Sequence, residues 1–390
     1  MNLNREVNGK IVKYKFGFWE RNYQKFKRSL RKYFYKDDDT VLNLLDTFDF
    51  IQHNTIQQQD IATTSLFLKK GYIGKSFLVE RNDVYQLTKV AIKEWNAGNK
   101  GALLVYGDAL TGKSTILESI NLAIPKLPVV YLKPHTTIHY KGRNFEVEYN
   151  LEEALKFINK YIYQDKVILA IDDLELWRDK QNSLYDNINT FIYNINKYNK
   201  NIFFIVSTNG WMKHHLDTYF RFNDYFIAEY CTNFTSNDDI LKAIVLRYIA
   251  SIKEDNQSAS WDDENQKIEK YIQYIIQHTH NNIGACLKHF YLSTRQKYEH
   301  ILSTPDSFVD LIERNRYLLK YILKLKKTDE FEMLKNIGAK SSRSGQLQIQ
   351  NLLNCKVLVR NNFGEINVNK AIIDYVEHIL HDFDLKFNYD

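Results

Sequence analysis

Short continuous apolar runs alternate with amphipathic segments between residues 72 and 234. A continuous apolar run bounded by polar residues is typical of a buried strand. Apolar residues at every third or fourth position are typical of a helix that buries one face. The alternation therefore predicts an α/β fold, in which helices cover a parallel sheet. Strands are expected at 102–106, 128–132, 166–171 and 201–209, and helices at 83–95, from 116 onward, at 151–163 and at 183–198.

Residues 135–149 follow a different pattern, in which apolar and polar positions alternate on both sides of Lys141 and Gly142. This alternation predicts a β-hairpin. Lys141 and Arg143 would make its tip basic, which makes the hairpin a candidate contact for DNA.

The turn after the first predicted strand fits the phosphate-loop pattern G-x-x-x-x-G-K-[ST]. In such a loop the backbone N–H groups and the N-terminus of the following helix face phosphates, the lysine neutralises them, and the next hydroxyl ligates magnesium. An ordinary strand-to-helix turn is the alternative, but the order of strand, loop and helix favours nucleotide binding. The loop residues are Gly107, Asp108, Ala109, Leu110, Thr111, Gly112, Lys113, Ser114 and Thr115.

Two carboxylates, Asp172 and Asp173, end a later apolar strand. Next to a phosphate loop, the first would hold magnesium through water and the second would polarise the attacking water. The following strand ends in Thr208 and Asn209, and either could orient that water, although a strand-end Asn is also common in turns.

These parts, in this order, resemble the AAA+ ATPases. The resemblance implies that the phosphate loop, the acidic strand and Asn209 lie side by side on a parallel sheet of residues 72–234. The segment 216–224 is similar to the one in which the family places an arginine finger. Arg221 would then reach the γ-phosphate held by a neighbouring subunit of a homo-oligomer, although a surface arginine in a loop is the alternative.

Residues 235–305 resemble the helical lid of the same family, with helices at 238–252 and 266–277 and a third starting near 281. Two positions depart from the family pattern. Asp173 stands where most relatives carry Glu, and its shorter side chain predicts slow hydrolysis. Gly284 stands where the lid often carries a sensor arginine, so Lys288, one turn later, is the candidate nucleotide-binding replacement unless no lid sensor exists.

Residues 306–390 resemble a winged-helix domain, with helices at 316–325, 328–334 and 344–353 and a wing formed by 356–368. Such domains place the third helix in the major groove of DNA. Winged helices also dock proteins, and that alternative stays open. The polar residues that the third helix offers are Ser341, Ser342, Arg343, Gln346, Gln348, Gln350 and Asn351.

The first 71 residues are expected to form a basic helical segment. Residues 1–36 hold eleven Lys and Arg against two acids, a net charge of +9, whereas the whole chain carries +6. Residues 22–36 have an apolar helical stripe with basic residues beside it. Such a helix packs on its own domain with a solvated basic face, or binds nucleic acid, an anionic membrane or an acidic partner.

Composition limits the class of protein. The hydrophobic fraction of 44% is typical of a globular chain, and no apolar run is long enough to span a bilayer. The three cysteines, Cys231, Cys286 and Cys355, are far apart and predict reduced core residues of a cytoplasmic protein.

The combined pattern resembles replication-initiator and transposon target-selection ATPases. It predicts an oligomeric ATPase, with ATP and Mg²⁺ as cofactors, that acts on duplex DNA as a switch or loader. The alternative is a signal-transducing NTPase scaffold that binds ATP and docks a protein partner through the winged helix.

Overall fold

A computed structural model describes residues 4–7, 10–13, 46–47, 49–55, 61–69, 71–140, 142–161, 166–198, 200–255, 261–295, 304–336 and 342–387. Its centre is a five-stranded parallel sheet in the order β4-β7-β8-β3-β9. The strands are β3 (Ala102–Gly107), β4 (Val129–Leu132), β7 (Val167–Ile171), β8 (Ile202–Asn209) and β9 (Ala228–Cys231). The predicted parallel sheet is therefore confirmed, although the sequence did not predict β9.

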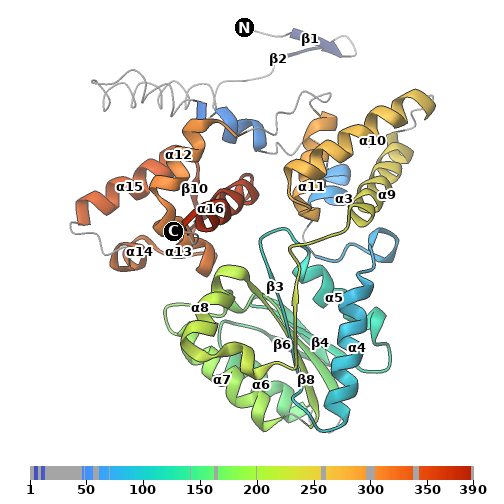
Figure 1. Cartoon of the computed structure of the whole chain (residues 1–390), viewed down its shortest axis with the longest axis vertical. Helices are drawn as coiled ribbons and strands as arrows, with labels where there is room; N and C mark the ends of the chain where they lie inside the picture. The colour runs from blue at the N-terminus through green and yellow to red at the C-terminus, as the bar shows by residue number, and fades with distance from the viewer. Residues whose placement is uncertain are drawn as a thin grey trace.

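Helices cover both faces of this sheet (Figure 1). Alternate side chains of a strand point to opposite faces, so Leu103 and Val105 of β3 pack on one side and Ala102 and Leu104 on the other. The first face carries α4 (Asn82–Asn96) and α5 (Lys113–Ala123). The second face carries α6 (Leu151–Tyr161), α7 (Leu184–Lys197) and α8 (Gly210–Phe220).

Shorter elements complete this core. The predicted hairpin is confirmed as β5 (Thr137–Tyr140) paired with β6 (Arg143–Glu146), whereas its tip residue Lys141 lies outside the described residues. Single 3-10 turns form η1 (Lys75–Phe77), η2 (Leu174–Leu176) and η3 (Phe222–Tyr225). The sheet with its two helical layers and its phosphate loop after β3 is an α/β P-loop fold, arranged as the AAA+ resemblance predicts.

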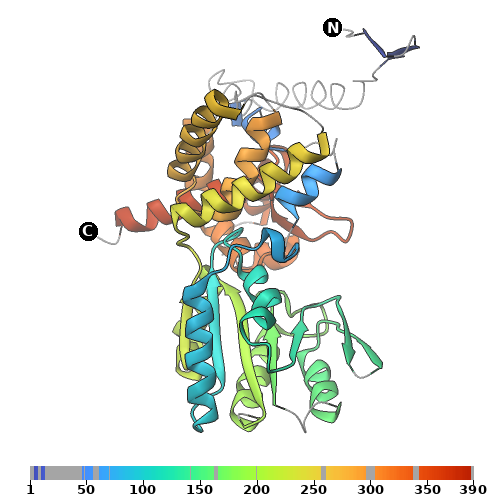
Figure 2. The same ribbon diagram turned by 90° about the vertical axis from the view of Figure 1, so that its right-hand side faces the viewer.

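A helical lid lies beside the carboxyl end of the sheet (Figure 2). It contains α9 (Asn237–Asp255), α10 (Trp261–His278) and α11 (Ile283–Arg295). An earlier helix, α3 (Ile61–Leu68), packs on the hydrophobic core of these lid helices through Phe67. The ring of Phe67 stacks on the ring of Phe290 in α11. Part of the N-terminal segment is thus built into the lid.

The C-terminal domain consists of helices around a small antiparallel pair of strands. Its elements are α12 (Asp306–Arg314), α13 (Arg316–Leu325), α14 (Glu330–Asn336), α15 (Ser342–Asn354), β10 (Leu358–Arg360), β11 (Ile366–Val368) and α16 (Ile373–Phe387). Phe50 and Ile51 also belong to this core. The sequence did not predict α12 and α16, and α16 proves important for the site.

At the N-terminus, β1 (Asn4–Val7) pairs with β2 (Lys10–Lys13). The basic helix predicted at 22–36 lies outside the described residues. None of the helices in the described part of the chain is long and apolar enough to cross a membrane.

Candidate nucleotide site

The phosphate loop connects β3 to α5 at the carboxyl edge of the sheet. Gly112, with φ of 91°, precedes α5, so the free N–H groups of the first helical turn open toward the loop. Lys113 is 6% exposed, and its Nζ donates to the carbonyl oxygens of Gly107 at 2.8 Å and Asp108 at 2.5 Å. Burial and then the charge of Lys326 lower the pKa of Lys113. The ammonium thus lies folded within the loop.

Asp172, at the end of β7, accepts hydrogen bonds from three hydroxyl groups. Its Oδ2 accepts from Ser114 at 2.8 Å and from Tyr131 at 2.6 Å, and its Oδ1 accepts from Ser207 at 2.5 Å. Lys133 Nζ lies 2.9 Å from the same Oδ2. The structure therefore brings together Ser114 and Asp172, the two residues predicted to hold magnesium.

This donor set fits a hard divalent cation. Magnesium is usually bound through one or two protein carboxylates while it keeps several waters, and here one hydroxyl and one carboxylate oxygen meet. Lys133 shows that positive charge is stabilised at this point. Among the described residues, no cluster of three or more His, Cys, Asp or Glu could hold a metal ion.

Asp173 and Glu175 form a second acidic pair just beyond Asp172. Asp173 has a φ of 52°, which turns the chain sharply into η2, and its Oδ2 lies 3.0 Å from Lys133 Nζ. Glu175 is fully buried. Lys326, which follows α13 of the C-terminal domain, pairs with Asp173 and lies 2.8 Å from Oε1 of Glu175.

Electrostatics at this pair are dominated by the lysines. Burial alone would raise the pKa of Asp173, but the charges of Lys326 and Lys133 outweigh it and hold that pKa well below its usual range. Burial would likewise lower the pKa of Lys326, yet the two carboxylates raise it. Asp173 and Lys326 are therefore both charged at neutral pH.

The two strand-end residues of β8 have different contacts. Thr208 donates its hydroxyl to Oε2 of Glu175 at 2.9 Å. Asn209 caps α8, since its Oδ1 accepts from the Met212 N–H at 2.7 Å. Its amide donates to the carbonyl oxygens of Leu323 and Lys324 at the end of α13. The role of Asn209 toward water stays a prediction.

A carboxylate of the C-terminal domain reaches the phosphate loop itself. Glu377 of α16 is buried, and its Oε2 accepts from the Ala109 N–H at 2.8 Å. Burial, followed by the charge of Asp108, raises the pKa of Glu377 to about 8. His381, on the next turn, lies 3.1 Å from the Asp108 carboxylate. The loop is thus covered by an acid that sequence reasoning missed.

The lid also closes on the loop, and this explains Gly284. Its N–H donates to the Leu110 carbonyl oxygen at 3.0 Å, and a Cβ at this position would collide with that carbonyl. Asn282 donates to the Ala109 carbonyl oxygen at 2.9 Å. A large sensor side chain could not replace Gly284 without moving the lid.

Lys288, the predicted substitute, makes contacts elsewhere. Its Nζ lies 2.5 Å from Oδ1 of Asp374 and donates to the Ala371 carbonyl oxygen at 3.0 Å. His289 Nε2 lies 2.9 Å from the other Asp374 oxygen. This buried cluster joins the lid to α16, and a nucleotide-binding role for Lys288 stays a prediction.

Arg221 lies where α8 ends and η3 begins. The residue is exposed, and its backbone adopts the left-handed conformation, with φ of 48°. Its predicted role toward a neighbouring subunit also stays a prediction.

Sequence reasoning did not identify Glu175, Lys326 or Glu377. Only Glu175 had a local signal, since it follows Asp172 and Asp173 in the same acidic turn.

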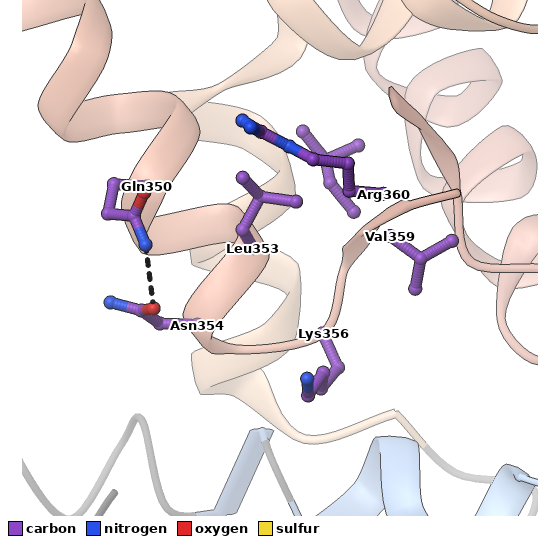
Figure 3. Close-up of a pocket in the computed structure, with 7 residues that line it drawn as sticks. Gln350, Leu353, Asn354, Lys356, Val359 and Arg360 are labelled. Atoms are coloured by element: carbon purple, nitrogen blue, oxygen red, sulfur yellow. Dashed lines mark hydrogen bonds between the residues drawn. The ribbon is translucent and has the colours of Figure 1, made fainter. Parts of the chain in front are cut away.

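The surface between α15 and β10 is hollowed and has both polar and apolar side chains. A shallow pocket there is lined by Gln350, Leu353, Asn354, Lys356, Leu358, Val359 and Arg360 (Figure 3). The Gln350 amide bonds the side chain of Asn354, while Arg360 pairs with Glu330. At the turn between β10 and β11, Phe363 is 91% exposed.

Comparison with known proteins gives distant matches only. No protein-family model and no curated protein matches the chain. One similar structure is the Aeropyrum pernix ORC2 protein with ADPNP and ADP, at 9% identity and a TM-score of 0.41, covering 82% of this chain and 98% of that one. The A. pernix ORC1 protein in complex with DNA has 12% identity and a TM-score of 0.42, covering 83% and 96%.

Thermotoga maritima RuvB, a Holliday junction branch migration motor, has 12% identity and a TM-score of 0.32, covering 75% of this chain and 93% of that one. At such identities and scores, these similarities carry no functional argument.

Proposed function

We propose that this protein is a magnesium-dependent ATPase whose nucleotide state controls how its C-terminal domain acts on duplex DNA. ATP would bind at Gly107 to Thr115, with Lys113 against its phosphates. Ser114 and Asp172 would hold magnesium, which would neutralise phosphate charge. Turnover would be slow, so that the nucleotide serves mainly as a switch.

The observation that carries this proposal is the direct contact between the C-terminal domain and the nucleotide site. Lys326 pairs with Asp173 and Glu175, and Glu377 accepts from the loop N–H of Ala109. A phosphate entering the loop would attract Lys326 and compete with Glu377 for the Ala109 N–H. Nucleotide binding and movement of the C-terminal domain are then one coupled equilibrium.

The DNA proposal rests on the exposed face of α15 and the neighbouring hairpin of β10 and β11. We interpret this domain as a winged helix, with α15 as the helix that enters the major groove. Gln, Asn and Arg side chains can hydrogen-bond base edges and phosphates. The exposed polar residues of α15 are Arg343, Ser344, Gln346, Gln348, Gln350, Asn351 and Asn354, and exposed Lys356 follows the helix.

Assembly of several copies would complete the site. The exposed position of Arg221 suits a side chain that reaches a neighbour. Mixing Arg221→Ala with Lys113→Ala protein should restore part of the ATPase activity at mixed interfaces. Complete inactivity of the mixture would contradict a role of Arg221 in trans.

Fluorescence anisotropy with a labelled duplex tests the DNA proposal, with apo, ATP-bound and ADP-bound protein compared at several salt concentrations. We expect nucleotide-dependent affinity that falls as salt rises, because phosphate contacts release counterions. Arg343→Ala combined with Lys356→Ala should weaken binding about tenfold or more. Lys126→Ala, which changes an exposed lysine after α5, should leave it unchanged. Absence of binding at low salt would overturn the DNA role and favour a scaffold that docks a protein.

A further inference from the structure

Resting on the proposed ATPase, we propose that Glu175, and not Asp173, is the carboxylate that takes the proton from the attacking water. Asp173 directly follows the metal-side residue Asp172, which made it the natural candidate from sequence. Both acids pair with Lys326, but their second partners differ: Lys133 after β4 pairs with Asp173, and Thr208 of β8 donates to Glu175.

The strand order decides which acid faces the loop. From one edge of the sheet it runs β4, β7, β8 and β3, and the phosphate loop follows β3. Oδ2 of Asp173 is held by Lys133, which directly follows β4. One oxygen of Asp173 is therefore held on the far side of β7 from the loop, while its other oxygen pairs with Lys326.

Glu175 is drawn in the opposite direction. Its Oε2 accepts from Thr208 of β8, and Thr208 pairs with Tyr106 of β3, the residue before Gly107. Glutamate also has one more methylene than aspartate. Glu175 thus has both the position and the reach to approach a water in line with a phosphate in the loop.

Lys326 holds Glu175 inactive in the conformation described here. Its ammonium lies 2.8 Å from Oε1 of Glu175 and occupies the side of that carboxylate that would otherwise be open to a water. The γ-phosphate of bound ATP would compete for the same ammonium. Transfer of Lys326 to the phosphate would free Glu175 and place a cation on the group that gains charge during the reaction.

The step balances without any other reactant. The water oxygen bonds to the γ-phosphorus while the bond from that phosphorus to the bridging oxygen breaks. The electron pair stays on the ADP oxygen, and the water proton passes to Glu175 and then to solvent. Thr208 stays hydrogen-bonded to the carboxylate and keeps it aimed at the water.

Single-turnover hydrolysis of γ-labelled ATP, measured beside ATP affinity, tests the assignment in the full chain. Glu175→Gln keeps the shape of the buried side chain but removes the base. We expect ATP affinity within about threefold of the parent and hydrolysis slower by about 100-fold or more, the range for loss of a general base. ATP recovered from this complex should be intact. Asp173→Asn, the matched control, should slow hydrolysis less than about tenfold.

Equal or larger loss of hydrolysis in Asp173→Asn would overturn the assignment, as would near-normal hydrolysis in Glu175→Gln. Thr208→Val provides a second measurement should Glu175→Gln fail to fold. It removes only the aiming hydroxyl, and we expect hydrolysis to fall about tenfold with ATP affinity kept. Unchanged hydrolysis in Thr208→Val would then count against Glu175. Failure of the parent protein to bind ATP would instead refute the proposed function.

Discussion

The candidate nucleotide site has two sides built in different ways. The sheet side consists of the loop after β3, the carboxylates after β7 and the hydroxyls at the end of β8. The covering side consists of Lys326 and Glu377, which come from the C-terminal domain. Residues on the sheet side are held mainly by one another, whereas the covering residues are ionisable groups that lie against the loop and its acids.

This difference separates binding from control. The sheet side has what a phosphate and its metal require: N–H groups, an ammonium, a hydroxyl and a carboxylate. The covering side adds an acid where an anion would bind, and a cation that pairs with Asp173 and with Glu175, the proposed base of hydrolysis. We infer that the sheet side supplies affinity and chemistry, and that the covering side sets when they are used.

The largest effect is expected on the sheet side. Lys113→Ala removes the ammonium of the loop, and each hydrogen bond to a charged phosphate contributes about 1.5–3 kcal/mol. ATP affinity should fall at least 100-fold, measured by isothermal titration calorimetry. A matched control, Lys126→Ala, should bind normally. Unchanged ATP binding in Lys113→Ala would refute the phosphate loop.

A large effect on stability is expected where the covering side is anchored. Asp374 of α16 compensates the buried Lys288 of the lid, and Asp374→Asn would leave that ammonium without its counter-charge. Breaking one partner of a buried pair costs about 3–5 kcal/mol. Urea unfolding at pH 7 should show this loss, while Asp382→Asn, at an exposed position of the same helix, should change stability little. Equal stability of both variants would contradict the anchoring role.

The sequence predicted the sheet side well because its signals are local. The loop pattern occupies nine consecutive residues, and the two aspartates directly follow an apolar run. Parallel strands bring their carboxyl ends to one edge, so these residues had to meet. Even the glycine at position 284 was noticed, although its cause, close approach to the Leu110 carbonyl oxygen, required the structure.

The covering side could not be predicted in the same way. Glu377 and Ala109 are separated by 268 positions, and Lys326 and Asp173 by 153. No spacing rule relates such pairs, because their meeting depends on how the C-terminal domain packs on the core. Helix α16 was not predicted as an element, so Glu377 had no place in the sequence-based site.

A smaller effect is expected when the covering carboxylate is removed. Glu377→Ala abolishes the contact with the Ala109 N–H, so ATP no longer displaces a competing acceptor. Loss of one such hydrogen bond, about 1.5 kcal/mol, predicts roughly tenfold tighter ATP binding. Asp382→Ala on the same helix should leave affinity unchanged. Weaker ATP binding in Glu377→Ala would show that the acid supports the site and does not block it.

The smallest expected effect is a pH dependence of ATP association. Burial and Asp108 raise the pKa of Glu377 to about 8 in the closed form, against opposing contributions from Lys113, the Ala109 N–H and His381. Once α16 moves away, the pKa should return toward its ordinary acidic value. The closed form, in which Glu377 contacts the loop, therefore holds a proton that Glu377 releases when α16 moves away. The contact between Glu377 and the loop weakens as the pH rises from the ordinary pKa of a glutamate toward 8.

Stopped-flow association of a fluorescent ATP analogue between pH 6 and 8.5 would measure this effect. We expect the rate for the parent, divided by the rate for Glu377→Ala, to rise about threefold, since one pKa unit corresponds to about 1.4 kcal/mol and only part of it reaches the rate. The ratio cancels titration of the nucleotide itself. His381→Asn should keep the rise if Glu377 causes it, whereas loss of the rise in that variant would assign the effect to His381. A ratio that does not change with pH would show that protonation of Glu377 does not control ATP association. Lys326 would then be the main charged group through which the covering side acts.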